Sequence, residues 1–293
     1  MIDWNPVAAA ISRATQARFE FTAATPVSGG DINKSYRLDG HNGACYFVKL
    51  NDTHKLAMFA AEQAGLEAIA ATGTVRVPRP IAHGAVGEYA FLVLEYLELN
   101  GSGNAGLLGE QLAALHRCGS NQFGWQQDNT LGETPQHNAW TSDWISFWRE
   151  QRLGFQLELA ARNGYGGKLQ DMGKQLLQRL PEFFGDYRPQ PSLLHGDLWG
   201  GNHAYTADGA PVIFDPAPYY GDREADLAMT ELFGGFDPQF YAAYRAAWPL
   251  DAGYATRRIL YNLYHILNHA NHFHGRYAKQ AEEMMQHLLY TPD

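Results

Sequence analysis

The fold of this chain is decided by Leu193-Leu194-His195-Gly196-Asp197-Leu198-Trp199-Gly200-Gly201-Asn202, which Ile213-Phe214-Asp215-Pro216 follows. An apolar run leads into a His-x-Asp turn, and an Asn comes five residues after the Asp. Thirteen residues beyond Asn202, a second hydrophobic run ends in Asp215. A single Asp after a strand is most often a cap in a tight turn. The order and spacing of the three polar residues together indicate a specific chemistry.

Phosphoryl transfer from ATP requires this set of side chains. One carboxylate must orient the acceptor hydroxyl and can take its proton, and Asp197 is the candidate for this catalytic base. An amide oxygen and a second carboxylate must hold Mg²⁺, which prefers oxygen ligands, and Asn202 and Asp215 are the candidates. His195 is expected to support the turn by hydrogen bonding and not to act as the base. The set predicts a kinase-like fold that uses ATP and Mg²⁺.

The composition is that of an ordinary globular protein. The 293 residues are 45% hydrophobic and 18% charged, and the net charge is −9. An acidic chain is a poor match for a nucleic-acid binder, whose affinity comes mainly from neutralising phosphates. The chain has no apolar run of about 18 residues, its start lacks signal-peptide features, and its two cysteines do not suggest a disulfide framework. We expect a cytoplasmic protein with neither nucleic-acid nor membrane partners.

The first third of the chain has the pattern of a small sheet with helices. A leading helix is expected within residues 1–20, where apolar side chains recur at helical spacing. The expected order is β-β-β-α-β-β, which predicts an antiparallel sheet in an N-terminal nucleotide-binding lobe, residues 1–97. The elements are strands at 22–28, 34–38 and 44–50, a helix at 58–71, and two strands after Pro78 and Pro80, the second at 90–96.

Helical patterns dominate the rest of the chain. Residues 98–106 are predicted to form a hinge, because Gly and Ser there weaken both helix and strand. Residues 107–293 are predicted to form a helical, catalytic and substrate-binding lobe. Its helices are expected at 107–117, 141–162 and 168–184 and from 226 to the end. The predicted fold class is α+β: a bilobal, protein-kinase-like fold with a small antiparallel-sheet N-lobe and a mainly helical C-lobe.

Two features of the N-terminal lobe fit a nucleotide site. Lys49, taken alone, would be a solvated strand residue, but the next helix offers Glu62, the partner that a phosphate-holding lysine requires. Gly29 and Gly30 lie between two expected strands. They form either an ordinary hairpin turn or a flap whose N–H groups approach the phosphates. Both interpretations stay open, because the segment matches neither a Walker A motif nor a complete kinase glycine loop.

Three other groups allow more than one interpretation. The segment 222–226, with three acidic residues and an arginine, suggests a helix N-cap with a bracing ion pair. The histidines at 265, 269 and 272 share a helical face, but no nearby carboxylate or cysteine completes a zinc site, so packing or substrate contact is favoured. The tryptophans at 140, 144 and 148 recur every four residues. Core packing is favoured for them, and a sugar-lining role stays open.

The chain resembles the fructosamine kinase (ketosamine-3-kinase) branch of the aminoglycoside-phosphotransferase-like kinases. The resemblance covers nearly the whole chain, and its most specific mark is the run from His195 to Asn202, which extends the His-Gly-Asp of the wider superfamily. Its other marks are Ser28-Gly29-Gly30-Asp31-Ile32-Asn33, Val48-Lys49, Phe59-x-x-Glu62-x-x-Gly65-Leu66, Leu94-Glu95-Tyr96-Leu97, Leu112-Ala113-x-Leu115-His116, Asn129-x-x-Gly132-x-Thr134-Pro135-Gln136 and Asp215-Pro216-Ala217.

The resemblance implies ATP-dependent phosphorylation of a sugar hydroxyl on ketosamines (fructosamines or ribulosamines), free or protein-bound, and hence a deglycation activity. It also implies that Glu95, Tyr96 and Leu97 form the adenine-binding hinge. It assigns the segment 129–136 to the family signature without giving its role.

The acceptor side is predicted from Trp199, which adjoins the base and can stack on the apolar face of a sugar. We expect its pocket between the Asp197 turn and the helices that carry the tryptophans at 140–148 and the histidines at 265–272. Two alternatives stay open: a kinase of the same fold that acts on aminoglycosides, choline or another small metabolite, and an inactive nucleotide-binding regulator. The four polar residues that catalysis is expected to need are all present, which disfavours the inactive regulator: Lys49, Asp197, Asn202 and Asp215.

Overall fold

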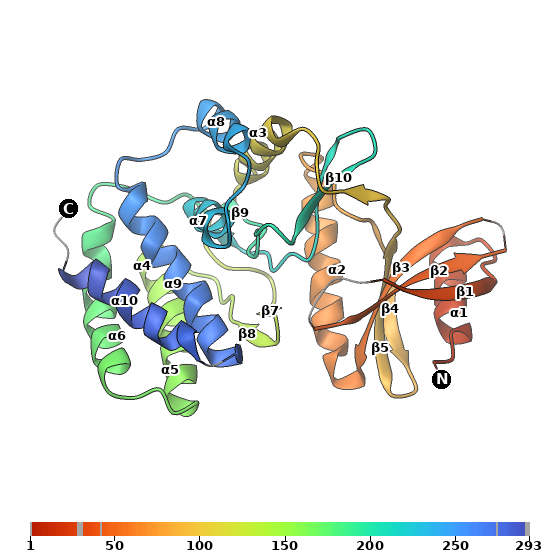
Figure 1. Ribbon diagram of the computed structural model, residues 1–293, viewed down its shortest axis with the longest axis horizontal. Helices are drawn as coiled ribbons and strands as arrows, with labels where there is room; N and C mark the ends of the chain where they lie inside the picture. The colour runs from red at the N-terminus through yellow and green to blue at the C-terminus, as the bar shows by residue number, and fades with distance from the viewer. Residues whose placement is uncertain (1, 28–31, 42, 274, 291–293) are drawn as a thin grey trace. The chain divides into compact units, whose positions relative to one another are not determined.

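The structure is a computed structural model that describes residues 2–27, 32–41, 43–273 and 275–290, so the expected flap of Gly29 and Gly30 lies outside the described residues. The chain divides into two compact units (Figure 1). The first comprises Met1–Asn104 and His203–Pro216, and the second comprises Ala105–Asn202 and Ala217–Asp293. The structure therefore differs from the predicted C-terminal lobe, residues 107–293, in the segment 203–216.

The first unit is built on a five-stranded antiparallel sheet with the strand order β1-β2-β3-β5-β4. Its strands and the helices beside them follow the predicted β-β-β-α-β-β order, and a short 3₁₀ turn, Thr53–Lys55, joins β3 to α2. The elements are α1 (Asn5–Thr15), β1 (Phe21–Val27), β2 (Lys34–Gly40), β3 (Cys45–Asp52), α2 (Leu56–Ala71), β4 (Pro80–Val86) and β5 (Tyr89–Glu95).

Strand β3 lies at the centre of this sheet, and successive side chains point to opposite faces. Val48 and Leu50 are buried in a core that includes Val7 and Ile11 of α1. Lys49 therefore points to the other face, where it is only 5% exposed. Its burial on a central strand excludes the interpretation of Lys49 as a solvated edge residue.

A smaller sheet brings the residues that follow Asn202 into the first unit. Strand β10 (His203–Thr206) pairs with β11 (Pro211–Ile213) and with β6 (Leu99–Asn100). Strand β11 also meets the chain at Arg76, whose carbonyl accepts a hydrogen bond from the Ile213 N–H at 3.0 Å. Asp215 follows two residues later. Because β6 lies inside the predicted hinge 98–106, part of that segment is β-structure, which its Gly and Ser content does not predict.

The second unit is mainly helical and carries two short antiparallel strand pairs, β7 with β8 and β9 with β12. Its helices are α3 (Ala105–His116), α4 (Trp144–Trp148), α5 (Phe155–Arg162), α6 (Lys168–Arg179), α7 (Glu224–Leu232), α8 (Pro238–Ala247), α9 (Tyr254–Phe273) and α10 (Arg276–Tyr290). Its strands are β7 (Asn129–Leu131), β8 (Thr134–Gln136), β9 (Ser192–Leu193) and β12 (Tyr220–Gly221).

Two predicted helices are shorter than expected, for local reasons. The helix predicted at 141–162 begins at Trp144, because the Asp143 carboxylate accepts the Ser146 N–H at 2.8 Å and caps the first turn. A π-helical segment, Arg149–Gly154, then separates α4 from α5. The helix predicted at 168–184 ends at Arg179 and continues as the 3₁₀ turn Leu180–Phe183, where Pro181 has no N–H to donate.

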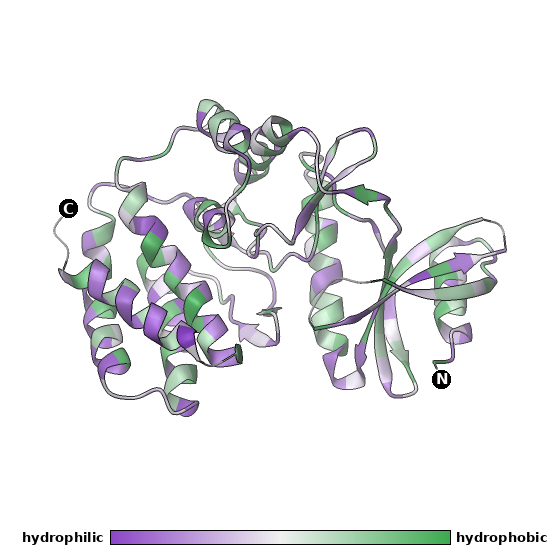
Figure 2. Ribbon diagram, viewed as in Figure 1, coloured by the Kyte–Doolittle hydropathy of each residue, from purple (hydrophilic) through white to green (hydrophobic). Residues whose placement is uncertain are grey.

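Hydropathy follows the packing of the helices in each unit. In Figure 2, α2 is mostly hydrophobic, whereas α10 carries both hydrophilic and hydrophobic residues. The buried side chains of α10 form one stripe: Ala281, Met285, Leu288 and Leu289. Among the described residues, none of the helices has both the length and the apolar character that crossing a lipid bilayer requires.

Candidate active site

The first unit contains a buried group of three charged side chains. Lys49 Nζ donates to Glu62 Oε1 at 2.6 Å and to Asp215 Oδ1 at 2.5 Å. The lysine and the glutamate are almost fully buried, whereas the Asp215 side chain is 40% exposed. The structure thus brings together three of the predicted site residues, which come from β3, from α2 and from the chain after β11. Asp215 is therefore the member of the group that solvent or a ligand can reach.

The charges of this group support one another. Burial alone would lower the pKa of the Lys49 ammonium, but the carboxylates of Asp215 and Glu62 outweigh it and raise this pKa above its ordinary value. Burial raises the pKa of Glu62, against the pull of Lys49. The 2.6 Å contact is the geometry of a charge-assisted hydrogen bond, so we take the pair as ionised. Lys49 is therefore held as a cation in a fixed position.

Asp215 has an unusual backbone conformation. Its φ of +58° lies in the left-handed region, which residues other than glycine seldom adopt, and Pro216 follows it. Asp tolerates this region better than most residues, yet such backbones are usually found where surrounding structure enforces them for function. The conformation directs the carboxylate to Lys49.

In the second unit, a buried carboxylate holds the turn that carries Asp197. Asp226 of α7 accepts the backbone N–H of His195 at 2.7 Å and that of Gly196 at 2.8 Å. His116 Nε2 lies 3.1 Å from the same carboxylate. Burial by itself would raise the pKa of Asp226, but the hydrogen bonds from His116 and from the Gly196 N–H hold this pKa below its usual range. The segment 222–226 thus includes an anchor for the turn, a role that the predicted N-cap does not describe.

The turn also depends on a glycine and a histidine. Gly196 has a φ of +83°, and a Cβ there would lie 2.0 Å from the Ala217 carbonyl oxygen, so no other residue fits without displacing the backbone. The Asp197 N–H donates to His195 Nδ1 at 3.2 Å. His195 therefore supports the turn as predicted, with Nδ1 as an acceptor.

Asn202 is tied to the same turn. Its Nδ2 donates to the Asp197 backbone oxygen at 2.8 Å and to Asp197 Oδ2 at 3.3 Å. These bonds fix the amide so that its Oδ1 faces away from Asp197 and keeps its lone pairs for another partner. The second unit thus brings together Asp197 and Asn202, while Asp215 belongs to the first unit.

Asp222 and Glu224 of the same segment have structural roles. Glu224 and Arg257 form a buried, bidentate ion pair with contacts of 2.7 and 3.1 Å. Asp222 accepts hydrogen bonds from the hydroxyls of Tyr187 and Tyr261 and from the Glu224 N–H. Glu224 thus forms an ion pair with a partner 33 residues away in the sequence, and not with Arg223, as a bracing pair within the segment would require.

The segment 129–136 now has a physical role. It forms the β7–β8 hairpin, and its two amide side chains bond to the backbone that follows Pro216. Asn129 Nδ2 donates to the Pro218 carbonyl at 2.8 Å, and Gln136 Nε2 donates to the Ala217 carbonyl at 3.0 Å. The two amides also bond to each other at 2.8 Å. These bonds satisfy buried carbonyls that lie outside the helices and strands and so lack a donor from regular secondary structure.

The side chains at the end of β5 take part in local contacts. The Glu95 carboxylate accepts Arg76 Nη2 at 3.1 Å and the Arg79 N–H at 3.3 Å. Tyr96 lies under the Arg37 guanidinium, 4.7 Å from the ring centroid. Its neighbour Leu97 is partly buried.

Trp199 is an exposed aromatic side chain beside Asp197. It is 39% exposed, and its ring makes an edge-on contact with Phe233, which in turn contacts His269 with ring centroids 4.9 Å apart. A Cβ at Gly201 would lie 2.3 Å from the Trp199 ring. This glycine therefore makes room for the tryptophan ring itself.

The tryptophan and histidine series do not form one lining. Trp144 and Trp148 are buried in the core, as favoured, whereas Trp140 is 44% exposed and stacks on Tyr220. His265 is buried, which lowers its pKa to about 3, so it stays neutral. Among the described residues, no three His, Cys, Asp or Glu side chains converge on a metal site, so the histidines lack the zinc geometry.

Comparison with known proteins places this chain in a family. The family model described as "Fructosamine kinase" matches residues 3–291. The chain belongs to the fructosamine kinase family. It is 51% identical to a probable ketoamine kinase of Synechocystis sp. over 98% of this chain and 97% of that protein. It is 44% identical to the chloroplastic protein-ribulosamine 3-kinase of Arabidopsis thaliana over 92% and 83% of the two chains.

Solved structures confirm the fold of this fructosamine kinase family member. A crystal structure of a candidate fructosamine-3-kinase from Haemophilus somnus has a TM-score of 0.89 at 28% identity and covers 97% of each chain. Aminoglycoside phosphotransferases share the fold at 11% identity. The α+β, bilobal kinase-like class is therefore confirmed, and the protein is an ATP-dependent phosphotransferase.

We predict that Asp226→Asn destabilises the protein by about 2–4 kcal/mol at pH 7, because an amide replaces one acceptor of a buried hydrogen-bond network with a donor. Because the pKa of Asp226 is lower in the folded than in the unfolded protein, its carboxylate stabilises the fold at pH values above the unfolded pKa of about 3.9. This contribution to the free energy of unfolding is lost as the pH falls through the folded pKa. The difference from wild type should therefore shrink below about pH 4. Unfolding free energies measured from pH 3 to 7 test this.

The matched control for that measurement is Asp186→Asn, an exposed carboxylate in the same unit. It should change stability little at any pH. A loss for Asp226→Asn that is as large at pH 3 as at pH 7 would show that the charge of Asp226 is not what holds the turn.

Proposed function

We propose that this protein transfers the γ-phosphoryl group of ATP to a sugar hydroxyl of a ketosamine, as the first step of deglycation. The observation that carries the proposal is the buried Lys49–Glu62–Asp215 group in a chain of the fructosamine kinase family. In this step the acceptor oxygen bonds to the γ-phosphorus, and the bond between that phosphorus and the β–γ bridging oxygen breaks. The hydroxyl proton goes to the Asp197 carboxylate, and ADP leaves.

Lys49 is proposed to bind the α- and β-phosphates. An ammonium has three N–H donors, and two of them go to Glu62 and Asp215. The third is then available to a phosphate oxygen. Because both carboxylates keep the lysine charged and fixed, little conformational freedom is lost when the nucleotide binds.

Asp215 and Asn202 are proposed as oxygen ligands of Mg²⁺. Asp215 Oδ1 is engaged by Lys49, which leaves Oδ2, and the Asn202 amide is oriented with Oδ1 outward. A carboxylate and an amide oxygen are the donors that this cation takes alongside phosphate and water. The ion, when bound, supplies positive charge to the phosphates.

The adenine is proposed to lie against the chain of Glu95, Tyr96 and Leu97. Since the Glu95 side chain is engaged with Arg76 and Arg79 and its N–H donates to the Arg79 carbonyl, the backbone groups of Tyr96 and Leu97 are proposed to contact the base. Gly29 and Gly30 are proposed as the flap over the phosphates, because glycine lets backbone N–H groups approach them closely.

The acceptor is proposed to stack on Trp199. A sugar has an apolar face of C–H groups that packs on an indole, and Trp199 is exposed two residues from Asp197. The Arabidopsis relative, named a protein-ribulosamine 3-kinase, supports a ketosamine over an aminoglycoside or choline. The acceptor is a free or a protein-bound ketosamine, and the reaction is proposed to take place in the cytoplasm, which suits two free thiols.

We predict that Asp197→Asn lowers kcat by roughly 10²–10⁴-fold and leaves nucleotide affinity within about twofold of wild type, since Asp197 acts on the acceptor. A coupled ADP-release assay with a ribulosamine and a nucleotide titration measure the two effects. Asp186→Asn is the control and should keep wild-type turnover. Near-normal kcat for Asp197→Asn would rule out its role as the base.

We predict that Asp215→Asn weakens binding of Mg²⁺·ADP by at least about tenfold and binding of metal-free ADP much less, because only the metal complex uses the carboxylate. Titration of each ligand by calorimetry separates the two. Equal losses for both ligands would mean that Asp215 acts only by holding Lys49.

We predict that Trp199→Ala raises KM for a ketosamine roughly three- to thirtyfold and leaves KM for ATP unchanged, because stacking on an exposed indole is worth about 0.5–2 kcal/mol. Trp140→Ala is a matched control, since Trp140 has a similar exposure in the same unit. Aminoglycosides should be poor acceptors. Robust turnover of aminoglycosides with none on any ketosamine would overturn the acceptor assignment and leave the kinase fold standing.

A further inference from the structure

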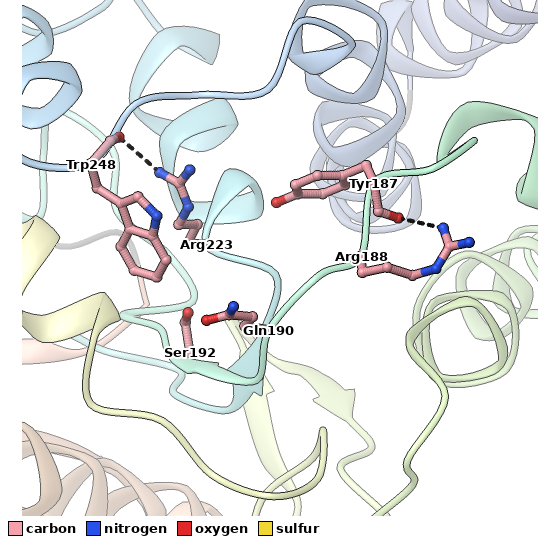
Figure 3. Close-up of a pocket in the computed structure, with 6 residues that line it drawn as sticks. All are labelled: Tyr187, Arg188, Gln190, Ser192, Arg223 and Trp248. Atoms are coloured by element: carbon pink, nitrogen blue, oxygen red, sulfur yellow. Dashed lines mark hydrogen bonds between the residues drawn. The ribbon is translucent and has the colours of Figure 1, made fainter.

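A cavity of about 90 Å³ lies in the second unit, where the chain enters α7 (Figure 3). None of its residues takes part in the phosphoryl transfer proposed above. They come from β9 and the segment before it, from the residue before α7 and from the residue after α8. The lining consists of Tyr187, Arg188, Gln190, Ser192, Arg223 and Trp248.

Arg223 gives this cavity a positive charge. The residue is only 6% exposed, and its guanidinium stacks on the Trp248 ring at 4.2 Å. Nη1 donates to the Tyr244 hydroxyl at 3.2 Å and to the Trp248 carbonyl at 3.1 Å, and Nη2 donates to the Pro249 carbonyl at 2.6 Å. All three acceptors are neutral. Within the described part of the chain, no carboxylate lies at ion-pair distance from this guanidinium.

The guanidinium has donors to spare. Arginine carries five N–H groups, and three of them are used here. The Nε–H and one Nη2–H have no acceptor among residues 2–27, 32–41, 43–273 and 275–290. Because Arg223 lines the cavity, these unused donors are open to solvent and to a ligand that enters it.

Other groups of the cavity fit an anion as well. The Ser192 hydroxyl has no hydrogen-bond partner in the described chain, and Gln190 points toward it in Figure 3. The Tyr187 hydroxyl is already used, because it donates to Asp222 at 2.9 Å. Arg188 bonds to the carbonyls of Gly185 and Tyr187 and not to a carboxylate.

A third arginine adds to the positive field. Arg117 lies over the same Trp248 ring at 5.5 Å and donates to the Ala247 carbonyl. Trp248 is thus contacted by two arginines, and no described carboxylate lies at ion-pair distance from either of them. The Glu224 carboxylate, next to Arg223 in the sequence, still interacts with the charge of Arg223, which opposes the rise that burial gives to the pKa of Glu224.

We propose that this cavity is an oxyanion site for one phosphate-sized tetrahedral anion. A guanidinium fork with two free N–H groups matches two oxygens of a phosphate or sulfate, and the Ser192 hydroxyl supplies a third donor. The volume suits a single tetrahedral anion and is well below the roughly 300 Å³ of pockets that take whole cofactors. The anion is free phosphate or the phosphate group of a small ester.

The site is connected to the catalytic turn. The Tyr244 hydroxyl that accepts from Arg223 also lies 2.8 Å from His116 Nδ1, and His116 Nε2 reaches Asp226. Asp226 holds the backbone of the Asp197 turn. An anion on Arg223 therefore binds at the end of a continuous hydrogen-bond chain that leads to this turn.

The test is a calorimetric titration with inorganic phosphate, sulfate and glycerol phosphate at constant ionic strength, against chloride. A saturating non-hydrolysable ATP analogue is present throughout, so that the γ-phosphate position of the nucleotide site cannot take up the anion. Binding of one phosphate or sulfate per chain is expected, with no binding of chloride. Equal affinity for glycerol phosphate identifies an ester as the ligand, and binding of phosphate alone identifies the free ion.

Two variants and a control decide where the anion binds. Arg223→Gln should weaken phosphate binding at least about tenfold, and Ser192→Ala about two- to tenfold, since charged and neutral hydrogen bonds differ in that order. Ser192→Ala removes only one hydroxyl oxygen. If Arg223→Gln does not fold, this second variant still tests whether the anion binds in the cavity. Arg162→Gln, an exposed arginine elsewhere in the unit, should bind as wild type does. A wild type that binds neither anion, or a folded Ser192→Ala that binds as wild type does, overturns the proposal.

Discussion

The carboxylate of Asp226 is the constraint on which the Asp197 turn of the second unit depends. Burying a carboxylate costs free energy because its charge loses hydration. Here two backbone N–H groups and an imidazole replace that hydration with hydrogen bonds. Those N–H groups belong to His195 and Gly196, the residues directly before Asp197. The position of the proposed base is therefore set by an acidic side chain that never meets a substrate.

Polar networks extend outward from this anchor. On one side His116, Tyr244 and Arg223 form a chain that ends at the cavity beside Trp248. On the other side, the β7–β8 hairpin uses two amide side chains to hold the carbonyls of Ala217 and Pro218. Apolar packing is non-directional, whereas hydrogen bonds fix orientation, so segments that carry chemistry are held by bonds of this kind.

The first unit uses a different principle. Alternation along β3 sends Val48 and Leu50 into the core against α1 and leaves Lys49 on the opposite face, with Glu62 of α2. A one-residue shift in the register of β3 would exchange these faces and remove the lysine from its partner. The chain that follows β11 supplies Asp215 as the second carboxylate.

The sequence by itself determined the elements with strong local patterns and the residues with a chemical signature. The β-β-β-α-β-β order, the pair of Lys49 and Glu62 and the family membership all follow from periodicity, spacing and motif. Local signals also explain two of the errors in helix ends: the cap at Asp143 and the proline at 181 were both present in the sequence.

Only the tertiary structure decided the contacts between residues far apart in the chain. Asp226 looks like any acidic residue near a helix start, and its bond to His195, 31 residues earlier, has no local sign. The same holds for Gln136, whose partner Ala217 is 81 residues away, and for the residues 203–216, which join the first unit by pairing with Arg76. Periodicity reports which face of an element is buried, but not which distant polar group meets it, because that choice depends on how the whole chain closes.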